Sequence, residues 1–232
     1  MAMAKQHPAH IYFSGRNLSR AQDLISDIHK TIPTASLTFI ELDLSSLLSI
    51  KTAIQQFSHK RLDILMCNAG IMAKPPQLSK DGYEIQFATN HLGHALLIKR
   101  LLPIMLKTVE KPGADVRIVL LTSTGWRGHP KGGINFAGLK TTQDFGAFGP
   151  WIRYGQSKLA NIVYAAELAR RYPSIISISV HPGSSYLLTK LLFSCIGAPE
   201  ARAVSRPSKW ITLVYLSVST LTTAPSSRVL TK

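Results

Sequence analysis

Short runs of β-forming residues alternate with longer amphipathic segments along most of the chain. The runs "HIYFSG", "SLTFIELDL", "LDILMC", "VRIVLLTS" and "SIISISV" are separated by segments whose apolar residues repeat at helical spacing, as over 18–28 and 80–108. Near-continuous apolar runs such as "LDILMC" are typical of strands buried in a parallel sheet. The alternation, with no linker to divide the chain, predicts an α/β fold in one domain over 1–232.

The charge balance is strongly basic, with 27 Lys+Arg against 12 Asp+Glu and a net charge of +15. Such a balance is compatible with nucleic acid, an anionic membrane or an anionic small ligand. No run of five like charges occurs, which favours a generic basic surface or a nucleotide phosphate over a specific nucleic acid. The longest apolar stretches fall short of the ~20 residues that a spanning helix needs, although peripheral membrane contact stays open.

The metal-binding residue types do not form a recognisable ligand pattern. Cys67 and Cys195 are too far apart in sequence for a metal motif or a disulfide framework. We therefore expect a reducing compartment and a cytoplasmic protein. His91 and His94 are three residues apart on one helical segment, but no further ligands accompany them. We interpret them as ordinary helix histidines and expect no metal.

Tyr154 and Lys158 are four residues apart in a helical segment, so their side chains share a face. A phenol with its ordinary pKa near ~10 is a poor acid or base at pH 7, but a nearby ammonium lowers that pKa. Such a pair can donate a proton to a carbonyl or take one from an alcohol. Most Tyr-x-x-x-Lys pairs are surface residues, so the interpretation depends on what lies around them.

Three further features are expected at the same edge of the sheet. Ser123 ends the strand "VRIVLLTS", "CNAG" (67–70) ends another strand, and Asn90 lies inside a helical segment. Ligands of parallel sheets gather outside the carboxyl ends of the strands. Each feature also has a simpler reading, namely a helix cap, an ordinary turn and a solvated asparagine.

The order "RN…LDL…CNAG…NHLGH…TS…YGQSKLAN…HPG" resembles the short-chain dehydrogenase/reductase family from about residue 10 to residue 183. "NHLGHALL" and "YGQSKLANIVYAAELAR" are most similar to its retinol-dehydrogenase-like and fungal short-chain reductase branch. The resemblance implies a Rossmann-like, doubly wound, mainly parallel sheet. Many members of that family pair through the helix that matches the one bearing Tyr154, so a homo-oligomer is one possibility and the oligomeric state stays open.

The resemblance implies a role for each matching residue. Tyr154 would be the proton donor or acceptor, Lys158 would lower its pKa and bind the nicotinamide ribose, Ser123 would orient the carbonyl, and Asn90 would hold a water. The residues expected along the rest of the cofactor are Asp43 and Leu44 at the adenine, Asn68, Ala69 and Gly70 at the adenosine, and Pro182 and Gly183 at the carboxamide.

Ser14 and Arg16 lie where enzymes of this family select their cofactor. A carboxylate at this place binds the ribose 2′-OH of NAD, whereas an arginine accommodates the 2′-phosphate of NADP. A hydroxyl and a guanidinium therefore predict NADP(H). The simpler reading is that Arg16 is a solvated turn residue.

Both ends of the chain depart from the family pattern. The resemblance implies a strand, a TGxxxGxG turn and a helix before Ser14, but "MAMAKQHPAH" leaves room only for the tail of that helix. We therefore expect the first βα unit to be missing, and its neighbouring strands to have unpaired edges or to be forced together. Region 184–232 is divergent: Leu187 stands where the family has a threonine, and 208–220 resembles the family's late helix.

Two hypotheses follow from these features. The first is an oxidoreductase that transfers a hydride between NADP(H) and a small-molecule carbonyl or secondary alcohol, with Tyr154 passing the proton. The second is a catalytically impaired truncated isoform or gene-model fragment that binds a partner through an exposed strand edge. Retinoids, steroids, polyketide ketones and small aldehydes all match the core motifs, so the substrate stays open.

Overall fold

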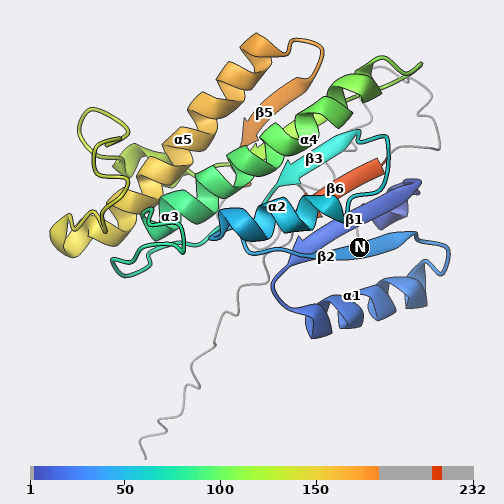
Figure 1. Ribbon diagram of the computed structural model, residues 1–232, viewed down its shortest axis with the longest axis horizontal. Coiled ribbons are helices and arrows are strands. Elements are labelled where there is room, and N and C mark those ends of the chain that lie inside the picture. The colour runs from blue at the N-terminus through green and yellow to red at the C-terminus, as the bar shows by residue number, and fades with distance from the viewer. Residues whose placement is uncertain (1–2, 183–210, 216–232) are drawn as a thin grey trace, which may run out of the picture.

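The computed structural model describes residues 3–182 and 211–215 and contains a six-stranded sheet covered by helices (Figure 1). The strands are β1 (His10–Gly15), β2 (Leu37–Glu41), β3 (Ile64–Cys67), β4 (Arg117–Leu121), β5 (Ile176–Val180) and β6 (Ile211–Tyr215). The helices are α1 (Leu18–Thr31), α2 (Leu47–Gln55), α3 (Ile85–Phe87), α4 (Gly93–Val109) and α5 (Gly149–Arg171). The short turns are η1 (Ala4–Gln6), η2 (Ala88–Leu92, π-helical), η3 (Thr124–Gly128) and η4 (Gly146–Phe148).

Every strand pairing in the sheet is parallel, and the strand order is β2-β1-β6-β3-β4-β5. Successive side chains point to opposite faces, so Leu65 and Cys67 enter one apolar cluster while Ile64 and Met66 enter the other. Helices α2, α4 and α5 cover the first face, and α1 contributes Ile28 to the second. The expected doubly wound, Rossmann-like α/β fold is confirmed.

The prediction for the centre of the sheet is wrong. We expected the edges of β1 and β3 to be unpaired or forced together, but β6 lies between them and pairs with both. The same finding corrects the helix expected over 208–220, because 211–215 form a strand. Ile, Thr, Val and Tyr favour strands, and two flanking strands offer this segment a full set of backbone partners. The remainder of 208–220 lies outside the described residues.

Helix α4 continues through Pro103, which the helical pattern alone would place near its end. Proline removes one backbone donor and crowds the carbonyl of the residue four positions earlier, here Lys99. Both residues are exposed, so water can bind the carbonyl that loses its partner. No helix within the described ranges is both long and apolar enough to span a bilayer.

Candidate active site

Helix α5, which carries Tyr154 and Lys158, contacts the carboxyl end of β4 at Leu121 and the turn after β3 at Gly70. Pro150 stands in the first turn of α5, where its missing N–H costs no helical hydrogen bond. The Lys158 ammonium lies 5.6 Å from the centre of the Tyr154 ring. The helix therefore brings a phenol and an amine together at the edge of the sheet where ligands of such folds bind.

Lys158 is almost fully buried, and burial lowers its pKa to about 8. Its Nζ donates one hydrogen bond to the carbonyl oxygen of Leu121, at the end of β4, at 3.1 Å. An ammonium has three N–H donors, so two remain after this contact for a ligand with hydroxyl groups. The side chain is therefore held at the sheet edge and stays mostly protonated at pH 7.

Tyr154 differs from the sequence-based expectation. Burial raises its pKa, and the hydrogen-bonding hydroxyl of Ser123 opposes that rise without cancelling it. The expected net lowering of the Tyr154 pKa is absent, because the cost of burying a phenolate outweighs the influences that favour it. Tyr154 is therefore a protonated phenol at neutral pH and can act as a proton donor.

Ser123 follows β4 and caps η3, with its Oγ accepting a hydrogen bond from the Gly125 amide at 3.1 Å. A Cβ on Gly125 would lie 3.0 Å from Cε1 of Tyr154 and 3.4 Å from the Ser123 Oγ. A side chain at residue 125 would therefore displace the tyrosine ring. Sequence reasoning missed Gly125, although its position two residues after Ser123 was a usable signal.

Asn90 lies in the π-helical turn η2 and is fully buried. Its Oδ1 accepts from the Ile71 amide at 2.8 Å, while its Nδ2 donates to the Ile71 carbonyl at 2.9 Å and to the Ser157 Oγ at 2.9 Å. The simpler reading of Asn90 as a solvated asparagine is therefore wrong, while its expected role in holding a water stays a prediction. Asn90 thus ties the loop after β3 to α5, through Ser157, which sequence reasoning also missed.

The "CNAG" turn brings bare backbone to the same place. A Cβ on Gly70 would lie 3.1 Å from Asn90 Oδ1 and 3.3 Å from Lys158 Nζ. Ala69 is buried, whereas Asn68 is partly exposed. The missing side chain at Gly70 therefore lets the backbone lie close to Asn90 and to the Lys158 ammonium.

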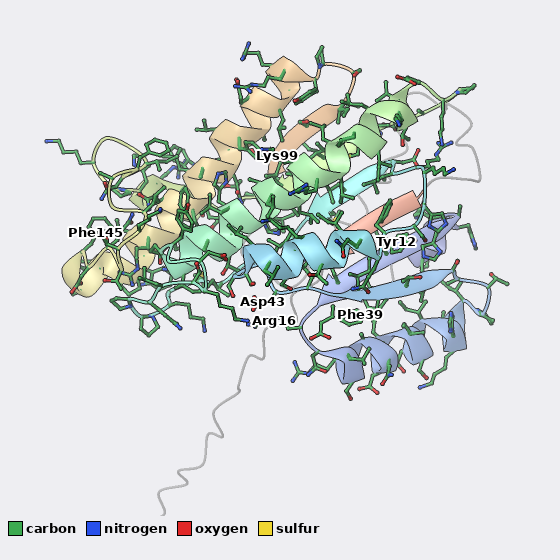
Figure 2. All side chains as sticks on the ribbon, in the orientation of Figure 1. Tyr12, Arg16, Phe39, Asp43, Lys99 and Phe145 are labelled. Atoms are coloured by element: carbon green, nitrogen blue, oxygen red, sulfur yellow. The ribbon has the colours of Figure 1, made fainter. Side chains whose placement is uncertain are left out.

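Arg16 and Asp43 line a surface hollow of about 530 Å³ at the ends of β1 and β2, and Figure 2 shows them close together. Burial works to raise the pKa of Asp43, but hydrogen bonds from the Ser45 hydroxyl and amide, together with Lys80, give a net lowering. Arg16 is exposed and Glu41 shares the hollow. Leu44 is buried, so only its backbone can flank a ligand.

Ser14 does not join this hollow. Its side chain is 2% exposed, and its Oγ has no hydrogen-bond partner among the described residues. It faces a small apolar cavity lined by residues that include Leu42, Phe57 and Leu101. Since side chains alternate along a strand, Ser14 points into the helix-covered face of β1. The prediction that the Ser14 hydroxyl contacts the cofactor phosphate is therefore wrong.

The remaining predicted residues are placed as follows. Pro182 is partly buried after β5, whereas Gly183 and Leu187 lie outside the described residues. His91 Nδ1 lies 3.1 Å from Asn161 Oδ1, and His94 Nδ1 lies 3.0 Å from the Asn90 carbonyl oxygen. Burial lowers the pKa of both histidines, that of His94 to about 4. Among the described residues, no group of three or more possible metal ligands occurs.

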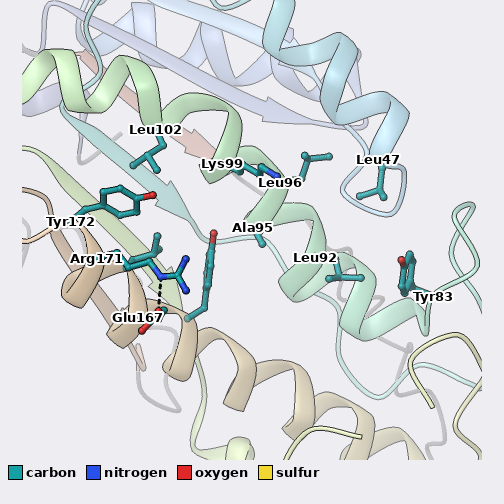
Figure 3. Close-up of a pocket in the computed structure, with 12 residues that line it drawn as sticks. Leu47, Tyr83, Leu92, Ala95, Leu96, Lys99, Leu102, Glu167, Arg171 and Tyr172 are labelled. Carbon is teal, nitrogen blue, oxygen red and sulfur yellow. Dashed lines mark hydrogen bonds and ion pairs between the residues drawn. The ribbon is translucent and has the colours of Figure 1, made fainter. Parts of the chain in front are cut away.

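A second depression, which Tyr154 does not line, lies between α4 and α5 (Figure 3). This groove has a volume of about 670 Å³ and is lined mainly by apolar side chains, including Leu92, Leu96 and Leu102. Glu167 forms an ion pair with Arg171 at one end of it. The groove lies partly on α5, the helix through which many members of the resembled family pair, and the oligomeric state of this chain stays open.

The buried ammonium of Lys158 yields a stability prediction. Folding lowers its pKa from 10.5 to about 8, so the folded state binds fewer protons than the unfolded state between these values. The cost is fully present below pH 8 and declines as the pH rises. Lys158→Met should therefore be more stable than wild type at pH 7, by about 1–3 kcal/mol.

Denaturant unfolding at several pH values checks this prediction. The stability difference between the two proteins should shrink by about 1–2 kcal/mol from pH 8 to pH 9.5, because the linkage slope is at most ~1.4 kcal/mol per unit. Cys67 and Tyr154 also titrate in alkali, but both proteins contain them, so they cancel in the difference. A difference that is constant over this range would contradict the lowered pKa of Lys158.

Comparison with known proteins identifies a family model and several relatives that are similar to this chain. The family model described as short chain dehydrogenase matches residues 1–138. An uncharacterized oxidoreductase of Schizosaccharomyces pombe is 41% identical over 181 residues, which cover 75% of this chain and 52% of the relative. The short-chain dehydrogenase/reductase drtF of Aspergillus calidoustus is 38% identical over 192 residues, covering 77% and 60%.

A solved structure of an uncharacterized protein from Mycobacterium paratuberculosis superposes with a TM-score of 0.62 at 26% identity. The match covers 82% of this chain and 76% of that one. By contrast, the chain spans only about half to three fifths of the length of the first curated relatives that it matches.

Proposed function

Because the chain belongs to the short-chain dehydrogenase/reductase family, we propose that it is an oxidoreductase acting on a carbonyl or secondary alcohol with NADP(H). One observation supports this most: four polar side chains gather at the ends of β3 and β4, packed against Gly70 and Gly125, and they are Asn90, Ser123, Tyr154 and Lys158. No metal or nucleophile is needed for this chemistry, since a phenol and an ammonium suffice to move the proton.

The residues present are suited to a nicotinamide cofactor. Lys158 is a buried ammonium with two donors that its contact to Leu121 does not use, which matches a pair of ribose hydroxyls. The backbone at Gly70 approaches that ammonium closely, because any side chain there would contact Lys158 Nζ and Asn90 Oδ1. When bound, the cofactor supplies or accepts a hydride at the substrate carbon.

The chain's own residues would handle the oxygen and its proton. The Ser123 hydroxyl would donate a hydrogen bond to the substrate carbonyl oxygen and so hold it beside the phenol. Tyr154 would transfer its O–H proton to that oxygen, which leaves a phenolate. The nearby Lys158 ammonium would stabilise this phenolate until a proton returns from solvent. In the oxidative direction, the phenolate would take the proton of the alcohol.

Arg16 supports the choice of NADP(H). It is exposed and lines the hollow at the end of β1, where an arginine matches a 2′-phosphate. Lys80 adds a second cation to the hollow, although it also pairs with Asp43 at 3.4 Å. Glu41 and Asp43 oppose them with two carboxylates, so the guanidinium is the group that would favour the phosphate.

Arg16→Ala is expected to weaken NADPH binding about 10-fold or more, because a hydrogen bond between charged groups is worth about 1.5–3 kcal/mol. Binding of NADH, which lacks the phosphate, should change by less than about 2-fold on the same reasoning. Fluorescence titration of both cofactors measures the effect without any turnover. Arg20→Ala is the matched control, since Arg20 is an exposed arginine nearby that does not line the hollow. Equal losses for both cofactors would contradict a phosphate contact.

A further inference from the structure

Two oppositely charged side chains are buried next to the candidate active site. Glu84 precedes α3, and Arg153 lies in α5 immediately before Tyr154. Both side chains are 0% exposed, and Arg153 Nε lies 3.3 Å from Glu84 Oε1. A buried ion pair is often no more stabilising than apolar side chains of similar volume. Its presence here therefore calls for a reason other than stability.

Each member of the pair also holds backbone. The Glu84 Oε2 accepts a hydrogen bond from the Phe87 amide at 2.7 Å and so caps α3. The Arg153 Nη1 donates to the Gln143 carbonyl at 2.9 Å, and its Nη2 donates to the Lys74 carbonyl at 2.8 Å. One guanidinium thus joins α5 to the cap of α3 and to two loops that are distant in sequence.

The Glu84–Arg153 pair lies at one end of the contact between the α3–η2 segment and α5, and the other end of this contact is in the active site. Helix α3 continues directly into η2, where Asn90 donates to Ser157 at 2.9 Å. Ser157 is one turn beyond Arg153 on α5 and adjoins Lys158. Two consecutive helical segments are therefore fixed against α5 at two points, Glu84 with Arg153 and Asn90 with Ser157. Between them lies Tyr154.

We propose that the Glu84–Arg153 pair is a positioning device that fixes α5 against the turn bearing Asn90, and so holds Tyr154 and Lys158 in their working arrangement. The catalytic consequence rests on the proposed function. The arrangement itself does not, because the environment of Lys158 can be measured without turnover. Neither Glu84 nor Arg153 touches the reacting atoms, and both act through the position of α5.

Glu84→Gln tests the proposal, because it keeps the shape of the side chain and leaves the guanidinium without its counter-charge. Loosening of α5 would admit water to Lys158, whose pKa should rise from about 8 towards its ordinary value of 10.5. The rate of acylation of each lysine, measured by mass spectrometry across pH on the full chain, reports this value. With active protein, kcat should fall about 10-fold or more while NADPH affinity is retained, as for a displaced catalytic group.

Two further variants make the result decisive. Arg153→Lys keeps the charge, but a lysine cannot reach both carbonyls and Glu84 at once. This variant should also raise the pKa of Lys158, and it provides the test if Glu84→Gln does not fold. Asp63→Asn is the matched control, since Arg61 and Asp63 form a partly buried pair at the start of β3, remote from the site. It should lower stability and leave Lys158 unchanged.

A pKa of Lys158 that stays near 8 in folded Glu84→Gln and Arg153→Lys would overturn the proposal and leave the pair a purely structural feature. An absence of turnover in the wild-type protein would instead refute the proposed function. The lysine titration would still decide the question of positioning, so the two failures are distinguishable.

Discussion

Tyr154→Phe should lower kcat for carbonyl reduction by about 10²- to 10⁴-fold, the range that a positioned proton donor contributes. The substitution removes only the phenolic oxygen, so the ring still packs against Gly125. Binding of NADPH should persist, because the Lys158 ammonium and its two unused N–H donors remain. The loss therefore belongs to the proton transfer and not to folding or cofactor affinity.

The measurement is NADPH consumption by the full chain with a panel of ketones and aldehydes, combined with fluorescence titration of the cofactor. Tyr164→Phe is the matched control, since Tyr164 is a partly buried tyrosine on the same helix that lines the α4–α5 groove. It should leave kcat unchanged. Comparable turnover in Tyr154→Phe and wild type would refute the assigned role, and no turnover in wild type with any carbonyl would count against the proposed function.

The tyrosine–lysine pair shows what the sequence can predict about the site. A spacing of four residues places both side chains on one helical face, and the observed 5.6 Å between ammonium and ring follows from it. Ser123 and the turn at 67–70 were predicted to meet because parallel strands end at one edge. These inferences needed only local periodicity and one rule about sheets.

Other features of the site depend on information that no local pattern carries. Ser14 lies in a strand that is buried on both faces, since its neighbour Phe13 is also buried, and alternation alone does not say which side chains reach the hollow. The π turn at Asn90 inserts an extra residue into a helix that reads as regular. Glu84 and Arg153 are distant in sequence and resemble solvated charges until the fold buries both.

The sequence predicts the fold where strands and helices alternate along the chain, but it does not predict which strand occupies the centre of the sheet. Residues 211–215 have strand-forming composition, but the similarity of 208–220 to a late helix gave the opposite expectation. The position of β6 is decided by two partners, β1 and β3, that lie about 200 and 150 residues earlier in the chain. Pairing at such separation is a property of the assembled sheet and not of the segment.

Strand β6 is the only connection between the two halves of the described sheet, β2-β1 on one side and β3-β4-β5 on the other. Leu213 pairs with Tyr12 on one side and with Leu65 on the other. Proline at this position would remove a backbone donor from the ladder and force a ring into a central strand. Leu213→Pro should therefore destabilise the protein by about 3 kcal/mol or more, a large part of the ~5–15 kcal/mol typical of a domain.

Leu213→Val separates the backbone effect from the side chain, because valine keeps the N–H and favours strands. Denaturant unfolding should show a much lower midpoint, or no cooperative transition, for the proline variant and a near-native one for valine. Without β6, the backbone groups of β1 and β3 that face each other would lose their partners, which costs far more than one side chain. A Leu213→Pro variant as stable as wild type would show that β6 does not hold the halves together.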